Sequence, residues 1–165
     1  MDELIATCAC GKVRIKALGP PILYAACYCD DCQAGARMIE ALPSAATVLD
    51  EWGGSHYLIY RNDRFAYVEG ADLLRGIKLK ETSPTTRFVA TCCNSAMMLQ
   101  FKPGWWTSLY RARFHGNAPR LELRTQTQHL PADAGVPGDV PMYRGFPLKL
   151  FWRLSTARLA MWFGQ

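Results

Sequence analysis

Seven cysteines grouped into three short clusters constrain this chain more than any other feature of its sequence. The clusters are Cys8 and Cys10 in TCACGKV, Cys27, Cys29 and Cys32 in CYCDDC, and Cys92 and Cys93 in ATCCNSA. Cysteines that act only as small buried apolar residues have no reason to be grouped in this way. Zinc binds thiolates in a tetrahedron, and the spacings C-x-C and C-x-x-C let one tight turn supply two or three ligands. The clusters therefore predict metal binding, with one or two zinc ions.

Two other uses of clustered cysteines fit the sequence less well. The number of cysteines is odd, and residues 1–10 show neither the basic nor the apolar region of a secretory signal. We therefore expect a cytoplasmic, reducing location, in which a disulfide framework is rare. A thioredoxin-type redox pair at Cys29 and Cys32 would open a helix within a β-α-β unit, and the sequence does not show that alternation.

The pattern of apolar residues predicts a mainly β fold. Segments rich in β-branched and aromatic residues are separated by Gly, Pro, Asn and Asp, which is typical of antiparallel strands. These segments are 12–18, 22–28, 55–61, 64–70, 74–80, 85–92 and 96–101. Residues 102–147 hold many of the prolines and glycines and predict an irregular arm. Since 165 residues suit one domain, we expect residues 1–101 to form a zinc-binding β domain on which residues 102–165 pack.

The last twenty residues change to a helical period. Large apolar side chains recur at i, i+3, i+4, i+11, i+14 and i+15, which places them on one stripe of a helix. The stripe consists of Leu148, Phe151, Trp152, Leu159, Trp162 and Phe163. Pro147 suits the first turn of this C-terminal helix. We expect the stripe to be buried against the sheet or against a second subunit, which would make the protein a homodimer.

Charge and hydropathy limit the partners of the chain. The formal net charge is +5, but the basic residues are scattered and form no run. That distribution favours a small anionic ligand, and we do not expect a nucleic acid as partner. No apolar run approaches the roughly 20 residues needed to cross a bilayer, so we expect no membrane partner either.

Taken in order, the motifs CxCGxVR, CxCxxCQ and CNSxM resemble the signature of the glutathione-dependent formaldehyde-activating enzyme family over about residues 5–101. That family also contains centromere protein V-like proteins. The resemblance implies a β-tent of antiparallel sheets with two zinc sites. It implies that Cys27, Cys29 and Cys32 bind a catalytic-type zinc near which glutathione docks. It further implies a structural zinc bound by Cys8 and Cys10 together with one or both of Cys92 and Cys93.

The sequence departs from the family pattern at two places. Tyr28 stands where the family has a histidine, so a substrate other than the formaldehyde adduct has to be considered. In the third cluster, the position of the fourth structural ligand falls on Ala90 in one register and on Val89 in the other. Cys92 and Cys93 would then both have to bind. Neighbouring strand residues point to opposite faces, so this requires a sharp turn of the backbone.

The chemistry of the middle cluster can be argued from the ligands alone. Three thiolates on Zn²⁺ leave a net charge near −1 and one open coordination position. A thiol that binds there loses its proton and stays nucleophilic. Together with the resemblance, this chemistry leads us to expect a zinc-dependent carbon-sulfur lyase that acts on an adduct of glutathione or a related small thiol. Cationic side chains should frame such an anionic ligand, and the candidates are Arg37, Lys78, Lys80 and Arg87.

Two alternatives belong to other functional classes. A zinc module on the same fold could bind a protein or nucleic acid without catalysis. A methionine-sulfoxide reductase is the other alternative, because CCNSA resembles the nucleophile motif of that enzyme, but it leaves the middle cluster unexplained. The three histidines are far from the clusters in sequence and show no ligand spacing, so we expect none of them to bind metal. These are His56, His115 and His129.

Overall fold

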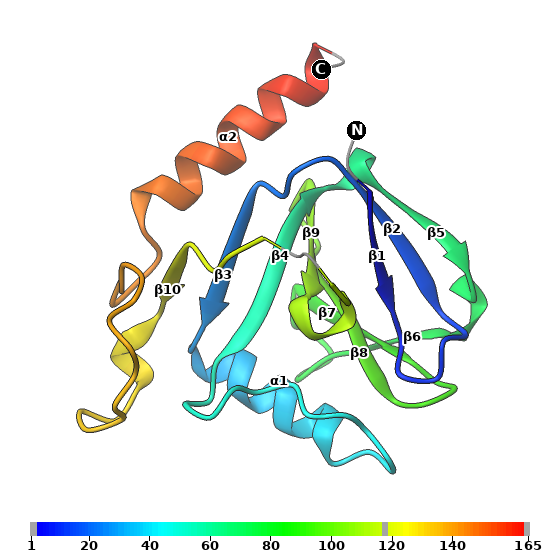
Figure 1. Ribbon diagram of the computed structural model, residues 1–165, viewed down its shortest axis with the longest axis horizontal. Coiled ribbons are helices and arrows are strands. Elements are labelled where there is room, and N and C mark those ends of the chain that lie inside the picture. The colour runs from blue at the N-terminus through cyan, green and yellow to red at the C-terminus, as the bar shows by residue number, and fades with distance from the viewer. Residues whose placement is uncertain (1–2, 117–118, 164–165) are drawn as a thin grey trace.

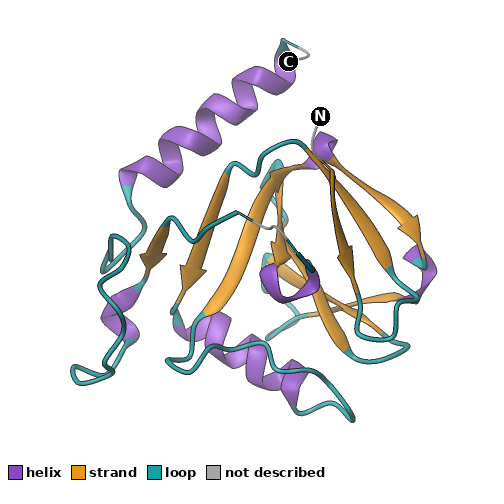
Figure 2. Ribbon diagram, in the orientation of Figure 1, coloured by secondary structure: helices purple, strands orange, loops and turns teal. Residues whose placement is uncertain are grey.

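The computed structural model describes residues 3–116 and 119–163, and it is mainly β, with two sheets and two α-helices (Figures 1 and 2). The small antiparallel sheet has the order β1 (Glu3–Thr7), β2 (Arg14–Leu18) and β5 (Phe65–Glu69). The large sheet has the order β10 (Leu123–Thr125), β3 (Leu23–Cys27), β4 (Ser55–Arg61), β9 (Trp106–Tyr110), β8 (Ser95–Phe101), β7 (Thr85–Ala90) and β6 (Leu74–Ile77). The helices are α1 (Asp30–Glu40) and α2 (Leu148–Trp162), and the short 3₁₀ turns are η1 (Asn62–Arg64), η2 (Ala71–Leu73), η3 (Arg111–Arg113) and η4 (Thr127–His129).

The predicted strands are confirmed, but the expected irregular arm contains two more. Each of the seven predicted segments holds one strand, from β2 to β8. The expectation of little regular structure after residue 101 was wrong for β9 and β10. Strand β9 lies inside the large sheet between β4 and β8, so the arm completes the sheet that the first 101 residues begin. Strand β10 pairs in parallel with β3, so the large sheet is mixed rather than wholly antiparallel.

The large sheet is covered on both faces. In β4, Leu58 and Tyr60 belong to the core shared with the small sheet. Tyr57 and Ile59 belong to a second core, which includes residues of α1 and α2. This alternation follows from the period of two along a strand. The sheet therefore separates two interiors, and the helices close one of them.

Helix α1 was not predicted. Cys29 is its N-cap residue, and two acidic residues occupy the first turn, where the helix dipole favours negative charge. Cys32, Ala36 and Ile39 are buried at i, i+4 and i+7, so one face of the helix packs on the sheet. In the sequence, the spacing of Cys27, Cys29 and Cys32 is typical of a metal-binding loop, so the helical period that begins at Cys32 was not recognised.

Helix α2 forms where the sequence predicts it, but its predicted stripe does not face the sheet. Leu150 and Leu154 are the buried residues of this helix. Most of the stripe points outward, and Trp152 on it is 72% exposed. Arg153 fixes the rotation of the helix, because its guanidinium donates two hydrogen bonds. One goes to Glu122 Oε2 at 2.6 Å, and the other goes to the carbonyl oxygen of Ile22, directly before β3, at 3.0 Å. Burial of the stripe against the sheet was therefore a wrong expectation. Among the described helices, none has the length and apolar character needed to span a bilayer.

Candidate metal centres and an adjoining cavity

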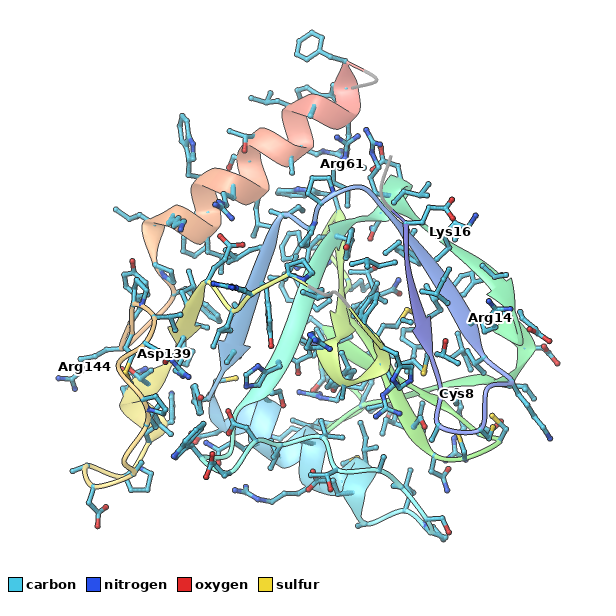
Figure 3. The ribbon with its side chains drawn as sticks, viewed as in Figure 1. Cys8, Arg14, Lys16, Arg61, Asp139 and Arg144 are labelled. Atoms are coloured by element: carbon cyan, nitrogen blue, oxygen red, sulfur yellow. The ribbon has the colours of Figure 1, made fainter. Side chains whose placement is uncertain are left out.

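Four cysteines from two distant parts of the chain meet at one point. Cys8 and Cys10 lie between β1 and β2, and Cys92 and Cys93 lie in the turn between β7 and β8; Figure 3 labels Cys8 there. The Sγ atoms of Cys10 and Cys92 are 3.3 Å apart, those of Cys8 and Cys92 3.8 Å, and those of Cys92 and Cys93 3.9 Å. A zinc tetrahedron with bonds of about 2.3 Å has edges of about 3.8 Å. This four-cysteine group could therefore hold a metal ion such as zinc.

Two left-handed backbone positions bring these ligands together. Gly11 has a φ of +83°, the conformation that the turn after Cys10 needs and that glycine adopts without strain. Asn94 has a φ of +52°, and it ends the tight turn that begins at residue 91. This is the sharp turn that allows Cys92 and Cys93 to point to the same centre. Two adjacent cysteines thus reach one point, which is what the resemblance required in the absence of a ligand at position 89 or 90.

A polar outer layer supports the four-cysteine group. Ser95 Oγ lies 3.1 Å from Cys93 Sγ and accepts a hydrogen bond from Ala9 N at 3.0 Å. It also accepts one from the buried Arg113 Nη1 at 3.2 Å. Burial lowers the pKa of Arg113, while the nearby Cys93 and Cys8 act in the opposite direction. Four thiolates on Zn²⁺ sum to a charge of −2, so a buried guanidinium beside them is electrostatically favourable.

The middle cysteines form a second group of different character. Cys27 ends β3, Cys29 caps α1, and Cys32 lies in the first turn of that helix. Their Sγ atoms lie within 4.8 Å of one another, so this three-cysteine group could also hold a metal ion. No further Cys, His, Asp or Glu joins it within residues 3–116 and 119–163. A metal held here would keep an open position, as catalytic zinc does.

The setting of this group modifies one argument against a redox pair. Cys29 and Cys32 do open a helix, which the sequence did not indicate. The helix joins the antiparallel strands β3 and β4, however, so it is not part of a β-α-β unit. Cys27 is brought to the same point by β3, and a two-cysteine redox site has no use for a third thiol in contact.

Hydrogen bonds couple the three thiols. Those from Cys27 and Cys32 lower the pKa of Cys29, and the bond to Cys29 raises the pKa of Cys27. The three thiols can therefore readily share one negative charge, but a bound cation is needed to keep all three as thiolates. Tyr57 Oη donates to Cys32 Sγ at 3.7 Å, and burial raises the pKa of Tyr57 well above its ordinary value, so this phenol stays a donor.

The three-cysteine group opens into a cavity of about 870 Å³ on the helix side of the large sheet. This volume lies in the usual range of small-molecule sites. The acidic and basic residues of its lining are Asp30, Asp31, Arg87 and His129. Aromatic residues dominate elsewhere, and they are Tyr57, Phe101, Trp105, Trp106, Phe146 and Phe151.

Of the four cations predicted to frame a ligand, Arg87 alone lines this cavity. It is 2% exposed, and its Nη2 donates to the carbonyl oxygen of Asp31 at 2.6 Å. Its guanidinium packs against Gly35, where a Cβ would overlap it. Arg87 therefore ties β7 to the helix that carries two of the cysteines. Arg37 instead bonds Gln33 on the exposed face of that helix, and Lys78 and Lys80 lie away from the cavity lining.

A family model, described as a family of unknown function and called DUF6151, matches residues 2–107. The chain belongs to this family. The DUF6151 span includes all seven cysteines. No curated protein matches the chain. A crystal structure of a Rhodobacter sphaeroides protein, solved as a structural genomics target, is similar over 84% of this chain and 98% of that one, with a TM-score of 0.50 and 19% identity. It shares the fold, and the resemblance to the formaldehyde-activating family remains a prediction.

Sequence reasoning missed one residue near the three-cysteine group of this DUF6151 chain. His129 Nδ1 lies 3.0 Å from Oδ2 of Asp30, which follows the helix-capping Cys29. The parallel pairing of β10 with β3 places η4, and with it His129, beside the start of α1. About one hundred residues separate the partners, and no local motif marks such a pairing. His115 is exposed and does not line the cavity.

Tyr28, which stands where the resembled family has a histidine, faces away from the cavity. Its hydroxyl donates to Asp50 Oδ2 at 2.9 Å, and it is fully buried. His56 Nε2 lies 2.9 Å from the same oxygen, and His56 Nδ1 lies 2.8 Å from Tyr24 Oη. Burial, followed by the charge of Asp50, raises the pKa of Tyr28. Tyr28 and His56 thus belong to a polar network behind β3, and neither is a candidate ligand or proton carrier at the cysteines.

Proposed function

We propose that this protein is a zinc-dependent carbon-sulfur lyase whose three-cysteine group binds the sulfur of a thiol adduct. The observation that carries the proposal is the contrast between the two groups of cysteines. The four-cysteine group is complete, whereas Cys27, Cys29 and Cys32 leave one position open toward an 870 Å³ cavity. The resemblance noted above points to an adduct of a thiol with formaldehyde, and glutathione is the first thiol to test.

The reaction needs no oxidant. In an adduct of the form R–S–CH₂–OH, the carbon-sulfur bond breaks, its electron pair stays on sulfur, and the hydroxyl group loses its proton as formaldehyde leaves. A zinc ion, when bound, supplies an open coordination position that stabilises the thiolate form of the sulfur.

Side chains that line the cavity can accept the hydroxyl proton and hold the cysteines in position. The Asp30 carboxylate accepts a hydrogen bond from His129 Nδ1–H at 3.0 Å, which leaves Nε2 of this cavity-lining histidine as a proton acceptor. The Gln128 amide nitrogen contacts that atom at 3.3 Å. Arg87 holds the first turn of α1 through Asp31, so it positions the cysteines without being a ligand. We propose His129 as the group that takes the hydroxyl proton.

The thiol-binding step gives a direct test. A neutral thiol that enters the open position must lose its proton, so binding should release about one proton per site near neutral pH. Titration calorimetry in two buffers of different ionisation enthalpy measures this number. The Cys32→Ser variant should lose the release, while His115→Gln, which changes an exposed histidine, should keep it. Thiol binding without proton release would contradict the proposal.

A non-enzymatic zinc module that binds a partner protein is the second candidate. The observation in its favour is the outward stripe of α2, since large exposed apolar patches mark interaction surfaces. A second copy of the chain is one such partner, as the sequence suggested. This candidate predicts full zinc content together with no thiol binding at millimolar concentration.

A further inference from the structure

The cavity beside the three cysteines has two unlike ends. Its charged residues all belong to α1 or bond to it: Asp30 and Asp31 are in the first turn, Arg87 bonds the Asp31 carbonyl oxygen, and His129 pairs with Asp30. We infer that the thiol-bearing substrate carries an uncharged apolar body, of the size of an aromatic ring or larger, rather than the charged peptide of glutathione. This inference rests on the proposed function, because the sulfur must sit at the three-cysteine group.

The sheet sets the length of the cavity. On the shared strand β4, Ser55 pairs with Cys27 and Arg61 pairs with Trp106. These two positions are six residues apart, or about 20 Å along the strand. A ligand whose sulfur lies near Cys27 first meets Tyr57 and Ile59, which line the cavity two and four positions along β4 from Ser55. The aromatic wall, formed by Phe101, Trp105 and Trp106, lies beyond them.

The aromatic wall is made of rings that contact one another. The rings of Trp105 and Trp106 are 5.2 Å apart at 82°, and those of Phe101 and Trp106 are 6.1 Å apart. Trp105 Nε1 donates to the Leu154 carbonyl oxygen at 3.1 Å, so its polar atom already has a partner. Apart from Arg87 on β7, the polar residues of the lining at β7, β9 and α2 are hydroxyls, namely Thr85, Ser108 and Ser155. Such a wall recognises apolar surface. A cation lies close to it, because the guanidinium of Arg158 is 5.5 Å from the centre of the Trp105 ring, but Arg158 is outside the cavity lining.

Charge at the other end also disfavours glutathione. Three thiolates on Zn²⁺ carry about −1, and Asp30 and Asp31 add two further negative charges. Arg87 is the one permanent cation of the lining. Its Nη2 donates to the Asp31 carbonyl oxygen, and its buried Nε lies against Gly35 with no hydrogen-bond partner among the described residues. Glutathione would bring two carboxylates and one ammonium group in addition to its thiolate, which gives a net charge of about −2. Like charges brought together in a cavity oppose binding, whereas a neutral apolar body meets no such opposition.

Three thiols that differ in the group attached to the sulfur distinguish an apolar substrate from a charged one. They are 2-phenylethanethiol, which has an aromatic body, 2-mercaptoethanol, which is uncharged and has none, and glutathione. With the zinc-loaded full chain, calorimetry should give an affinity for 2-phenylethanethiol at least about tenfold above that for either of the others, because only its ring can bury apolar area. Each thiol that binds should release about one proton.

Two neighbouring residues of α2 supply a matched pair of variants. Phe151 lines the cavity and is 53% exposed, so Phe151→Ala should fold and should reduce the affinity for 2-phenylethanethiol at least about threefold, with no change for 2-mercaptoethanol. Trp152 is outside the lining, so Trp152→Ala should leave both affinities unchanged.

The outcomes distinguish this inference from the proposed function. If glutathione binds as tightly as 2-phenylethanethiol and releases a proton, the apolar substrate class is wrong and thiol binding at the cysteines stands. An equal loss in the Phe151 and Trp152 variants would also overturn the inference. If none of the three thiols binds with proton release, the proposed function fails, and the inference fails with it.

Discussion

At the scale of single residues, the cysteines could be grouped from the sequence, but their geometry could not. The spacing marked each cluster as a set of candidate ligands, the resemblance placed Cys8 and Cys10 with the third cluster, and Gly11 marked a turn with positive φ. Whether Cys92 and Cys93 could share one centre depended on the backbone at Asn94, which is left-handed. A non-glycine residue adopts that conformation only where its surroundings favour it, and one sequence does not reveal this.

Asp50 is the residue on which the network behind β3 depends. Burial would raise its pKa, but hydrogen bonds from His56, Gly54, Tyr28 and Trp52 together hold the pKa below its ordinary value. A carboxyl group whose folded pKa is lowered stabilises the fold above its unfolded pKa of about 4, and this stability is lost as the pH falls through the folded pKa.

We therefore expect Asp50→Asn to lower the free energy of unfolding at pH 7 by about 1–3 kcal/mol, because an amide cannot accept all of these bonds. The variant should also lose part of the decline in stability below pH 4. Urea unfolding across pH 3–7 measures both, with the exposed Asp133→Asn as control. An unchanged pH profile in the Asp50 variant would show that the network contributes no stability.

At the scale of elements, periodicity predicted the type of an element better than its partners. The strands with clear β-branched and aromatic patterns were found, whereas β9 was hidden by the adjacent Pro103 and Gly104 and β10 by its length of three residues. The period of α2 was visible, but the larger side chains suggested the wrong buried face. Leucines at 150 and 154 pack inward because Arg153 and the arm fix the rotation of the helix.

The buried face of α2 can be tested with two leucines of the same helix. Leu154 is 6% exposed, and Leu159 on the predicted stripe is 49% exposed. Leu154→Ala should lower the free energy of unfolding by about 2 kcal/mol, since it removes buried methyl groups at a cavity wall. Leu159→Ala should change it by no more than about 0.5 kcal/mol. Chemical denaturation gives both values, and the reverse order would restore the stripe as the packing face.

At the scale of the whole molecule, the two groups of cysteines join different parts of the fold. The four-cysteine group links the β1–β2 connection of the small sheet to the β7–β8 turn of the large one. The three-cysteine group links the end of β3 to the start of α1 beside the cavity. The four-cysteine group therefore holds two layers together, whereas the three-cysteine group faces a space that a ligand can enter. A metal at the first should contribute to folding, and a metal at the second should be removable from a folded protein.

Metal analysis of protein purified without added zinc tests this division most directly. The wild type should contain about two equivalents of zinc. Cys29→Ser should contain about one and keep its far-ultraviolet circular dichroism spectrum and thermal midpoint nearly unchanged. Cys93→Ser should also lose about one equivalent, but its thermal midpoint should fall clearly, because the metal there stabilises the fold. Full zinc content in Cys29→Ser, or no zinc in the wild type, would contradict the account.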